Sequence, residues 1–225
     1  MTKNVLLITG ASTGIGAATA RAAVAAGWSV ALSARSADRL DALVGELGAD
    51  NALAMACNVQ SLADQEAMVA ATVDRFGRLD AAFANAGLGA SSPGTLGGDP
   101  ANWEEMILTN VLGLTYTCRA VADAIIASKG HILLTGSRAG RVALKGSVYG
   151  ATKWYVTGYG QNLREEMAVH GVRVTLIEPG MVDTPFFDTP KPDALKDTDI
   201  ANAVLYALTQ PAHVNVSEML VLPMR

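Results

Sequence analysis

The stretch TGASTGIG, residues 9–16, decides the fold of this chain. It lies between a short apolar run at residues 5–9 and an Ala-rich, helix-like segment at 14–26. The spacing G-x-x-x-G-x-G suits a tight turn whose backbone approaches a pyrophosphate at a helix N-terminus. An ordinary strand-to-helix turn is the alternative, but the position after the first strand favours a nucleotide loop. The residues predicted to bind the cofactor here are Gly10, Ser12, Thr13, Gly14, Ile15 and Gly16.

Strand-like and helix-like segments alternate along the rest of the chain. Short apolar runs predict strands at 5–9, 29–34, 51–57, 79–84, 132–135, 172–177 and 219–222, and helical patterns cover 14–26, 37–47, 62–76, 103–128, 149–169 and 199–208. This order is typical of a parallel sheet covered by helices on both faces. No linker or repeat divides the chain. We therefore expect an α/β fold: one doubly wound Rossmann domain over residues 1–225 with a mainly parallel, seven-stranded sheet.

The composition excludes several classes of protein. Half of the 225 residues are apolar and 17% are charged, which favours a compact globule with a large core. A net charge of −4 and the lack of a long basic run argue against a nucleic-acid partner. No run of 18 apolar residues is present, and the first apolar segment is too short for a signal peptide, so we expect a cytoplasmic protein with no membrane partner. Cys57 and Cys118 each stand in an apolar run and are expected to be buried, reduced thiols.

The residues after the second predicted strand bear on the choice of dinucleotide. Ala34 stands where folds that prefer NAD usually carry an acid, and Arg35 follows it directly. A guanidinium here can pair with the 2′-phosphate of NADP and lie against the adenine. The alternative is a solvated surface arginine. With Ala34 in place of the acid, we expect the cofactor to be NADP(H).

The stretch SVYGATKWYV, residues 147–156, carries a candidate proton-transfer pair. Tyr149 and Lys153 are one helical turn apart and share a face. Ser137 lies 12 residues before Tyr149, just past the fifth strand, where ligands of such sheets bind. An ammonium favours a nearby phenolate, so we expect Lys153 to lower the pKa of Tyr149. A tyrosine and a lysine alone are more often a surface pair; with Ser137 and the glycine loop, catalysis is favoured.

Three aromatic residues nearby have no such partner. No lysine follows Tyr155 or Tyr159 four residues on, because Tyr159 and Leu163 occupy those positions. With Trp154, they are predicted to be core or subunit-contact aromatics, and a place for Tyr155 near the site stays open.

Taken together, these motifs resemble the short-chain dehydrogenase/reductase family over nearly the whole chain. Besides the glycine loop and Tyr149-x-x-x-Lys153, the resemblance rests on Asn85-Ala86-Gly87, Asn110, Ser137 and the segment from Pro179-Gly180 to Thr184. It implies that Asn110, Ser137, Tyr149 and Lys153 are catalytic, that Tyr149 is the general acid/base, that Lys153 also holds the nicotinamide ribose, and that Asn110 links Lys153 to solvent through water. The further cofactor contacts that it implies are Asn58, Val59, Asn85, Ala86, Gly87, Tyr149, Lys153, Pro179, Gly180, Val182 and Thr184. No metal is expected.

Two positions depart from the family pattern. Ala84 replaces the first Asn of an Asn-Asn-Ala-Gly motif, and Asn58 stands where an Asp usually meets the adenine amine. The amide oxygen of Asn58 can still accept a hydrogen bond, but without the charge the contact should be weaker.

The C-terminal segment is similar to the branch that includes serine and 3-hydroxy acid dehydrogenases, which prefer NADP. The resemblance implies a homodimer or homotetramer that pairs helices 103–128 and 149–169, and a small hydroxy acid, alcohol or carbonyl as substrate. The other readings are an NADP-binding redox sensor without turnover, and a non-redox relative such as an epimerase or lyase. The intact Ser137, Tyr149 and Lys153 argue against the sensor, and the intact glycine loop argues against the non-redox relative.

Two variable segments are expected to shape the substrate pocket. They are the loop 88–100, with Ser91 and Ser92, and a mobile flap at 184–196, with Phe186 and Phe187. One of Arg138, Arg141 and Lys145 can meet a substrate carboxylate, although a solvated or subunit-contact role for all three is the favoured alternative.

Overall fold

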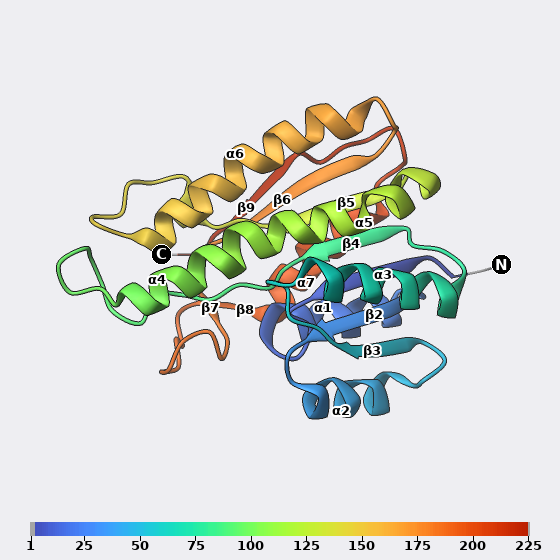
Figure 1. The fold of residues 1–225 in the computed structure, drawn as a ribbon, viewed down its shortest axis with the longest axis horizontal. Helices are drawn as coiled ribbons and strands as arrows, with labels where there is room; N and C mark the ends of the chain where they lie inside the picture. Colours follow the sequence, from blue (N-terminus) through green and yellow to red (C-terminus); the bar gives the residue numbers. More distant parts are fainter. Residues whose placement is uncertain (1–2, 225) are drawn as a thin grey trace.

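A seven-stranded parallel sheet forms the centre of the computed structural model, which describes residues 3–224 (Figure 1). Its order is β3-β2-β1-β4-β5-β6-β9, and every pairing is parallel. The strands are β1 (Val5–Thr9), β2 (Ser29–Ala34), β3 (Ala52–Ala56), β4 (Ala81–Ala84), β5 (His131–Thr135), β6 (Arg173–Pro179) and β9 (Glu218–Val221). The strand order reverses between β1 and β4, and ligands of such sheets bind at this switch point, beyond the carboxyl ends of the strands. The predicted α/β fold is confirmed.

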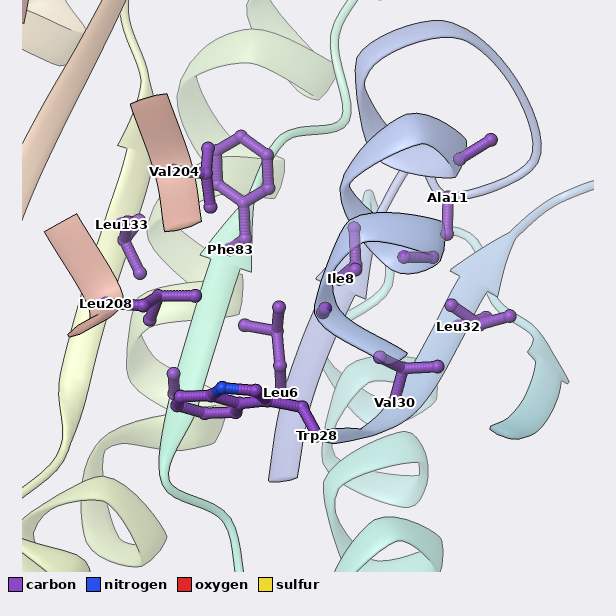
Figure 2. Packing of buried hydrophobic residues seen from close by; sticks show 14 of the residues in the cluster. Leu6, Ile8, Ala11, Trp28, Val30, Leu32, Phe83, Leu133, Val204 and Leu208 are labelled. Atoms are coloured by element: carbon purple, nitrogen blue, oxygen red, sulfur yellow. The ribbon is translucent and has the colours of Figure 1, made fainter. Parts of the chain in front are cut away.

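Helices cover both faces of the sheet. One core cluster joins the sheet to α1 (Gly14–Ala25), α2 (Ala37–Leu47) and α7 (Asp197–Thr209), and a second joins it to α3 (Leu62–Phe76), α5 (Leu114–Ser128) and α6 (Val148–Ala168). All residues of β1 and β2 are buried, as expected for strands covered on two sides. Figure 2 shows the first cluster, where Leu6 and Ile8 of β1 lie near Phe83 and Val204.

The helix predicted at 103–128 is longer and less regular than expected. It begins as α4 (Pro100–Met106), passes through a π-helical segment, η1 (Ile107–Gly113), and continues as α5. The side chain of Asp99 caps the first turn by accepting from the amide of Ala101 at 3.0 Å, and Pro100 occupies the first helical turn. Asp99 and Pro100 thus start the helix at residue 100, three residues before the predicted start at 103. The other predicted helices and the seven predicted strands begin and end within two residues of the observed bounds.

The predicted flap at 184–196 is tied down at both ends. A short parallel pair, β7 (Val182–Asp183) and β8 (Leu195–Lys196), closes its base. In addition, a carboxylate oxygen of Asp183 accepts from the backbone amide of Lys191 at 2.9 Å. The flap therefore leaves and rejoins the fold at fixed points beside the end of β6.

The helical run Pro100–Ser128 is, within the described residues, long and apolar enough by length and composition to cross a membrane, with a mean hydropathy of 1.3. A core helix of a soluble protein meets the same criterion. In this fold α5 packs against α3 and the sheet, and Val121 and Ile125 are fully buried. The helical run Pro100–Ser128 is therefore a core helix of a soluble α/β fold.

Candidate active site

A cavity of about 510 Å³ opens at the carboxyl ends of the strands. Its walls come from the segments that follow β1, β2, β3, β4, β5 and β6, together with the flap. All but two of the predicted site residues line it: Gly10, Ser12, Thr13, Gly14, Ile15, Arg35, Asn58, Val59, Asn85, Ala86, Gly87, Ser137, Tyr149, Lys153, Pro179, Gly180, Val182 and Thr184. The two exceptions are Gly16 and Asn110.

The glycine loop has room only for glycine at its key positions. Gly10 has a φ of +64°, and a Cβ on it would lie 2.8 Å from the Cα of Ala86. A Cβ on Gly16 would lie 2.3 Å from the carbonyl oxygen of Gly10. Gly16 therefore lets α1 pack onto the turn and is not part of the cavity wall. The result is an open cradle of backbone at the N-terminus of α1, which fits the pyrophosphate of a dinucleotide.

Asn85 holds this cradle to the neighbouring strand ends. Its amide nitrogen donates to the carbonyl oxygens of Thr9, at 3.1 Å, and of Gly10, at 3.3 Å. Its side-chain oxygen accepts from the hydroxyl of Thr135 at 3.2 Å. Asn85 thus connects the ends of β1, β4 and β5, and these contacts require an amide side chain at this position. Ala84, the residue before it, is buried and apolar.

The end of the cavity beside β2 is cationic. Arg35 lines it, and so does Arg39, four residues further on in α2. Both side chains are exposed, and no acidic residue lines the cavity within the described part of the chain. Two free guanidinium groups fit a ribose 2′-phosphate, whereas the ribose hydroxyls of NAD are usually met by a carboxylate. Nearby, the side-chain oxygen of Asn58 accepts from the amide of Gln60 at 3.1 Å and keeps a second lone pair for a ligand.

Ser137, Tyr149 and Lys153 come together at the other end. Ser137 follows β5, and its hydroxyl accepts from the amide of Ala139 at 3.0 Å. Ser147 caps α6 by accepting from the amide of Gly150 at 2.9 Å, so the helix starts just before Tyr149. Lys153 is buried, and its ammonium donates to the carbonyl oxygen of Thr135 at 2.8 Å and lies 5.8 Å from the centre of the Tyr149 ring.

Burial sets the protonation of this pair. It raises the pKa of Tyr149, and a hydrogen bond with Ser137 only partly offsets the rise. It lowers the pKa of Lys153 to about 8. The expectation that Lys153 lowers the pKa of Tyr149 is therefore wrong, because desolvation of the phenol dominates and the ammonium turns toward Thr135. Tyr149 is held as a neutral phenol at pH 7, which is the form that donates a proton.

Asn110 lies beneath the cavity and does not line it. Its side chain is buried in η1, accepts from the amide of Leu88 at 2.9 Å and donates to the carbonyl of Leu88 at 2.9 Å. It also donates to the hydroxyl of Thr152 at 3.2 Å. Asn110 thus fixes the start of the loop 88–100 against α6. The water link to Lys153 that the resemblance implies stays a prediction.

The flap contributes apolar side chains to the cavity wall beside Tyr149. Phe186 and Phe187 line it as expected, with Pro185, Leu88 and Gly89. The prediction for Ser91 and Ser92 is wrong, because neither lines the cavity. The amide of Ser91 donates to the side-chain oxygen of Asn102 at 2.9 Å, which holds this part of the loop against α4.

The three cations between Ser137 and Tyr149 do not reach the cavity. Arg141 pairs with Glu178 at 2.7 Å and with Glu218 at 2.6 Å. Arg138 and Lys145 are exposed, and none of the three lines the cavity. The carboxylate contact considered for these residues therefore does not fit the geometry, since an internal ion pair holds Arg141. The solvated role that the sequence favoured fits Arg138 and Lys145, which face outward.

Comparison with known proteins agrees with this geometry. The family model described as short chain dehydrogenase matches residues 4–194. The chain belongs to the short-chain dehydrogenase family. An uncharacterised oxidoreductase of Staphylococcus haemolyticus is 39% identical over 224 residues, covering 97% of this chain and 96% of the relative.

Two solved structures superpose closely on this chain. An alcohol dehydrogenase from Thermococcus sibiricus, complexed with 5-hydroxy-NADP, has a TM-score of 0.92 and 32% identity and covers 99% of this chain and 97% of its own. A closed form of serine dehydrogenase complexed with NADP+ has a TM-score of 0.90 and 34% identity, and the match covers 97% of this chain and 94% of the serine dehydrogenase chain. The resemblance to the serine dehydrogenase branch is thus confirmed.

Trp154, Tyr155, Tyr159 and Cys118 do not line the cavity of this short-chain dehydrogenase, whereas Cys57 does. Tyr155 stacks on Tyr159 with ring centres 5.6 Å apart, bonds the hydroxyl of Thr115 at 2.8 Å, and does not line the cavity. Trp154 is 50% exposed, so the core role considered for it is wrong. Both cysteines are free and buried as predicted, and burial raises the pKa of Cys118 to about 12.

Sequence reasoning missed several lining residues, which are Ser36, Arg39, Cys57, Gln60, Thr109, Thr135 and Gly136. Only Arg39 had a usable signal, since it is a second arginine four residues after Arg35, in the first turn of the predicted helix 37–47.

Proposed function

We propose that this chain is an NADP(H)-dependent oxidoreductase that interconverts a small carbonyl compound and its alcohol, with Tyr149 as general acid/base. One observation carries the proposal: Ser137, Tyr149 and Lys153 line the same cavity as the glycine loop. A neutral phenol, a hydroxyl and a buried ammonium at the end of a dinucleotide cradle form a set that suits carbonyl reduction.

In reduction, the carbonyl carbon gains a hydride and the carbonyl oxygen gains a proton. The nicotinamide, when bound, supplies the hydride and is left oxidised. The hydroxyl of Ser137 donates a hydrogen bond to the oxygen as negative charge develops on it. Tyr149 gives its phenolic proton to that oxygen, and solvent then returns a proton to the phenolate that remains. Alcohol oxidation runs the same proton transfer in reverse.

Three features support NADP(H) over NAD(H). Ala34 stands at the end of β2 in place of an acid, and Arg35 and Arg39 line the cavity there. Two close structural relatives were solved with NADP or a derivative of it. In this proposal Lys153 holds the nicotinamide ribose, Asn58 and Val59 meet the adenine, and the segment from Pro179 to Thr184 meets the carboxamide.

The assembly and location proposed are those of a single-domain, cytoplasmic homodimer or homotetramer. The support comes from apolar side chains on the exposed faces of η1 and α6: Ile107, Leu112, Trp154 and Tyr155 are each more than a third exposed. A small-molecule substrate is the proposed partner, with no role for nucleic acid or membrane.

Oxidation of NADPH, followed at 340 nm against a panel of ketones, aldehydes, oxo esters and oxo acids, tests the function. We expect turnover of at least one carbonyl and at least tenfold lower kcat/KM with NADH. A protein that binds NADPH but oxidises none of the panel would instead be the redox sensor, and isomerisation without net change in NADPH would indicate the epimerase.

A further inference from the structure

The cavity differs in charge between its two ends. Its cationic lining residues, within residues 3–224, are Arg35, Arg39 and Lys153. Arg35 follows β2 and Ser137 follows β5, which are three strands apart in the sheet. At a strand spacing of about 4.8 Å, this separation is about 14 Å. The cation beside Tyr149 is therefore Lys153, whose ammonium already donates to the carbonyl oxygen of Thr135.

The other cations near this end are turned to different partners. Arg141 lies in the ion pairs with Glu178 and Glu218. Lys191, on the flap, lies 5.4 Å from the centre of the Phe187 ring, donates to the hydroxyl of Thr189 at 3.0 Å and does not line the cavity. A substrate carboxylate beside Tyr149 would find no guanidinium at this end of the described cavity wall, because Arg35 and Arg39 line the other end.

Phe186 and Phe187 of the flap form an aromatic wall of the cavity beside Tyr149, in place of a guanidinium. The ring of Phe186 lies 5.9 Å from that of Tyr149, centre to centre, and packs edge-on against Phe187 at 5.2 Å. Phe186 remains 43% exposed. An exposed ring beside the proton donor gains stability when an apolar group covers it, and aromatic groups pack on it at offset or tilted angles.

Gly89 gives this ring its place. A Cβ on Gly89 would lie 2.8 and 2.9 Å from two carbons of the Phe186 ring. The loop after β4 and the flap after β6 are thus fitted to each other through one glycine and one phenylalanine, and any side chain at position 89 would displace the wall.

We infer that the substrate end accepts a neutral carbonyl compound whose apolar, preferably aromatic, substituent packs on Phe186, and that it does not anchor a carboxylate. This inference rests on the proposed function and narrows it. It separates this chain from an acid-binding enzyme in spite of its resemblance to the serine dehydrogenase branch.

Three matched substrates test the inference: methyl phenylglyoxylate, phenylglyoxylate and methyl pyruvate, each reduced with NADPH. We expect kcat/KM for the phenyl ester to exceed that for the phenyl acid at least tenfold, and that for methyl pyruvate at least fivefold. Phe186→Ala should lower the phenyl-to-methyl ratio at least fivefold, and Gly89→Ala should lower it too. Gly45→Ala, on α2 where a Cβ meets nothing within 4 Å, is the control and should leave the ratio unchanged.

The inference is overturned if the acid matches or exceeds its ester, or if Phe186→Ala leaves the ratio as it was. If the acid is preferred and Lys191→Met removes that preference, the flap lysine is a carboxylate clamp. Calorimetric binding of the ester and the acid to Tyr149→Phe loaded with NADPH reports the same preference without turnover. Selective ester binding with no NADPH oxidation by the wild type would support this inference and reject the proposed function. Rapid turnover of the acid would support the proposed function and reject this inference.

Discussion

Replacing Arg141 by Met should destabilise the protein strongly, although the residue lies outside the cavity. Arg141 donates to a carboxylate oxygen of Glu178, whose side chain is only 2% exposed. Removal of one partner of a buried ion pair costs about 3–5 kcal/mol, because the other charge stays buried and unpaired. The hydroxyl of Thr157 still donates to Glu178 at 3.2 Å, so we expect the lower end, about 3 kcal/mol.

For a chain of this size, a loss of about 3 kcal/mol lowers Tm by roughly 6–12 °C, which scanning calorimetry resolves easily. Arg138→Met is the matched control, since Arg138 is exposed, and it should change the free energy of unfolding by less than about 0.5 kcal/mol. The double variant Arg141→Met with Glu178→Met should recover most of the loss, because well-packed apolar groups replace buried ion pairs at little cost. A Tm of Arg141→Met within 2 °C of the wild type, on the order of 0.5 kcal/mol, would refute this reasoning.

Three further predictions concern the cofactor and the buried lysine. Arg35→Ala should weaken NADPH binding about tenfold to a hundredfold, since a hydrogen bond to a charged group contributes about 1.5–3 kcal/mol. In the same fluorescence titrations, NADH binding should stay within about twofold. Equal losses of NADPH and NADH binding would place Arg35 away from the 2′-phosphate. Gly10→Ala should abolish NADPH binding in the same titration, because its Cβ would lie 2.8 Å from Ala86, and an unchanged Kd would contradict the cradle. Lys153→Met should raise the free energy of unfolding at pH 7 by about 3 kcal/mol, because burial lowers the pKa of Lys153 from 10.5 to about 8. Between pH 8 and 10.5 the unfolded wild type binds more protons than the folded wild type, so the stability of the wild type rises with pH. In urea titrations, the stability gained by Lys153→Met should therefore shrink over this range. A gain that does not change with pH would contradict this prediction.

Local patterns made the frame of this fold predictable. Each strand of a doubly covered parallel sheet is a continuous apolar run, and the glycine spacing and the i, i+4 pair of Tyr149 and Lys153 need no knowledge of distant residues. These features placed most of the cavity wall correctly.

Long-range contacts account for what the sequence did not reveal. Arg141 meets Glu178 across 37 residues, so nothing local distinguishes it from the exposed Arg138. The π-helical turn that directs Asn110 to Leu88 has no signature in ILTNVLG. The rise in the pKa of Tyr149 comes from burial, which the spacing to Lys153 does not report.

Tyr149→Phe is the most direct test of the central claim, with Tyr155→Phe as its control on the same helix. Both variants should bind NADPH with the wild-type Kd. With a carbonyl that the wild type reduces, Tyr149→Phe should lose about 10²- to 10⁴-fold in kcat/KM, the usual contribution of a positioned proton donor, while Tyr155→Phe stays within about twofold. Near-wild-type turnover by Tyr149→Phe would contradict the account.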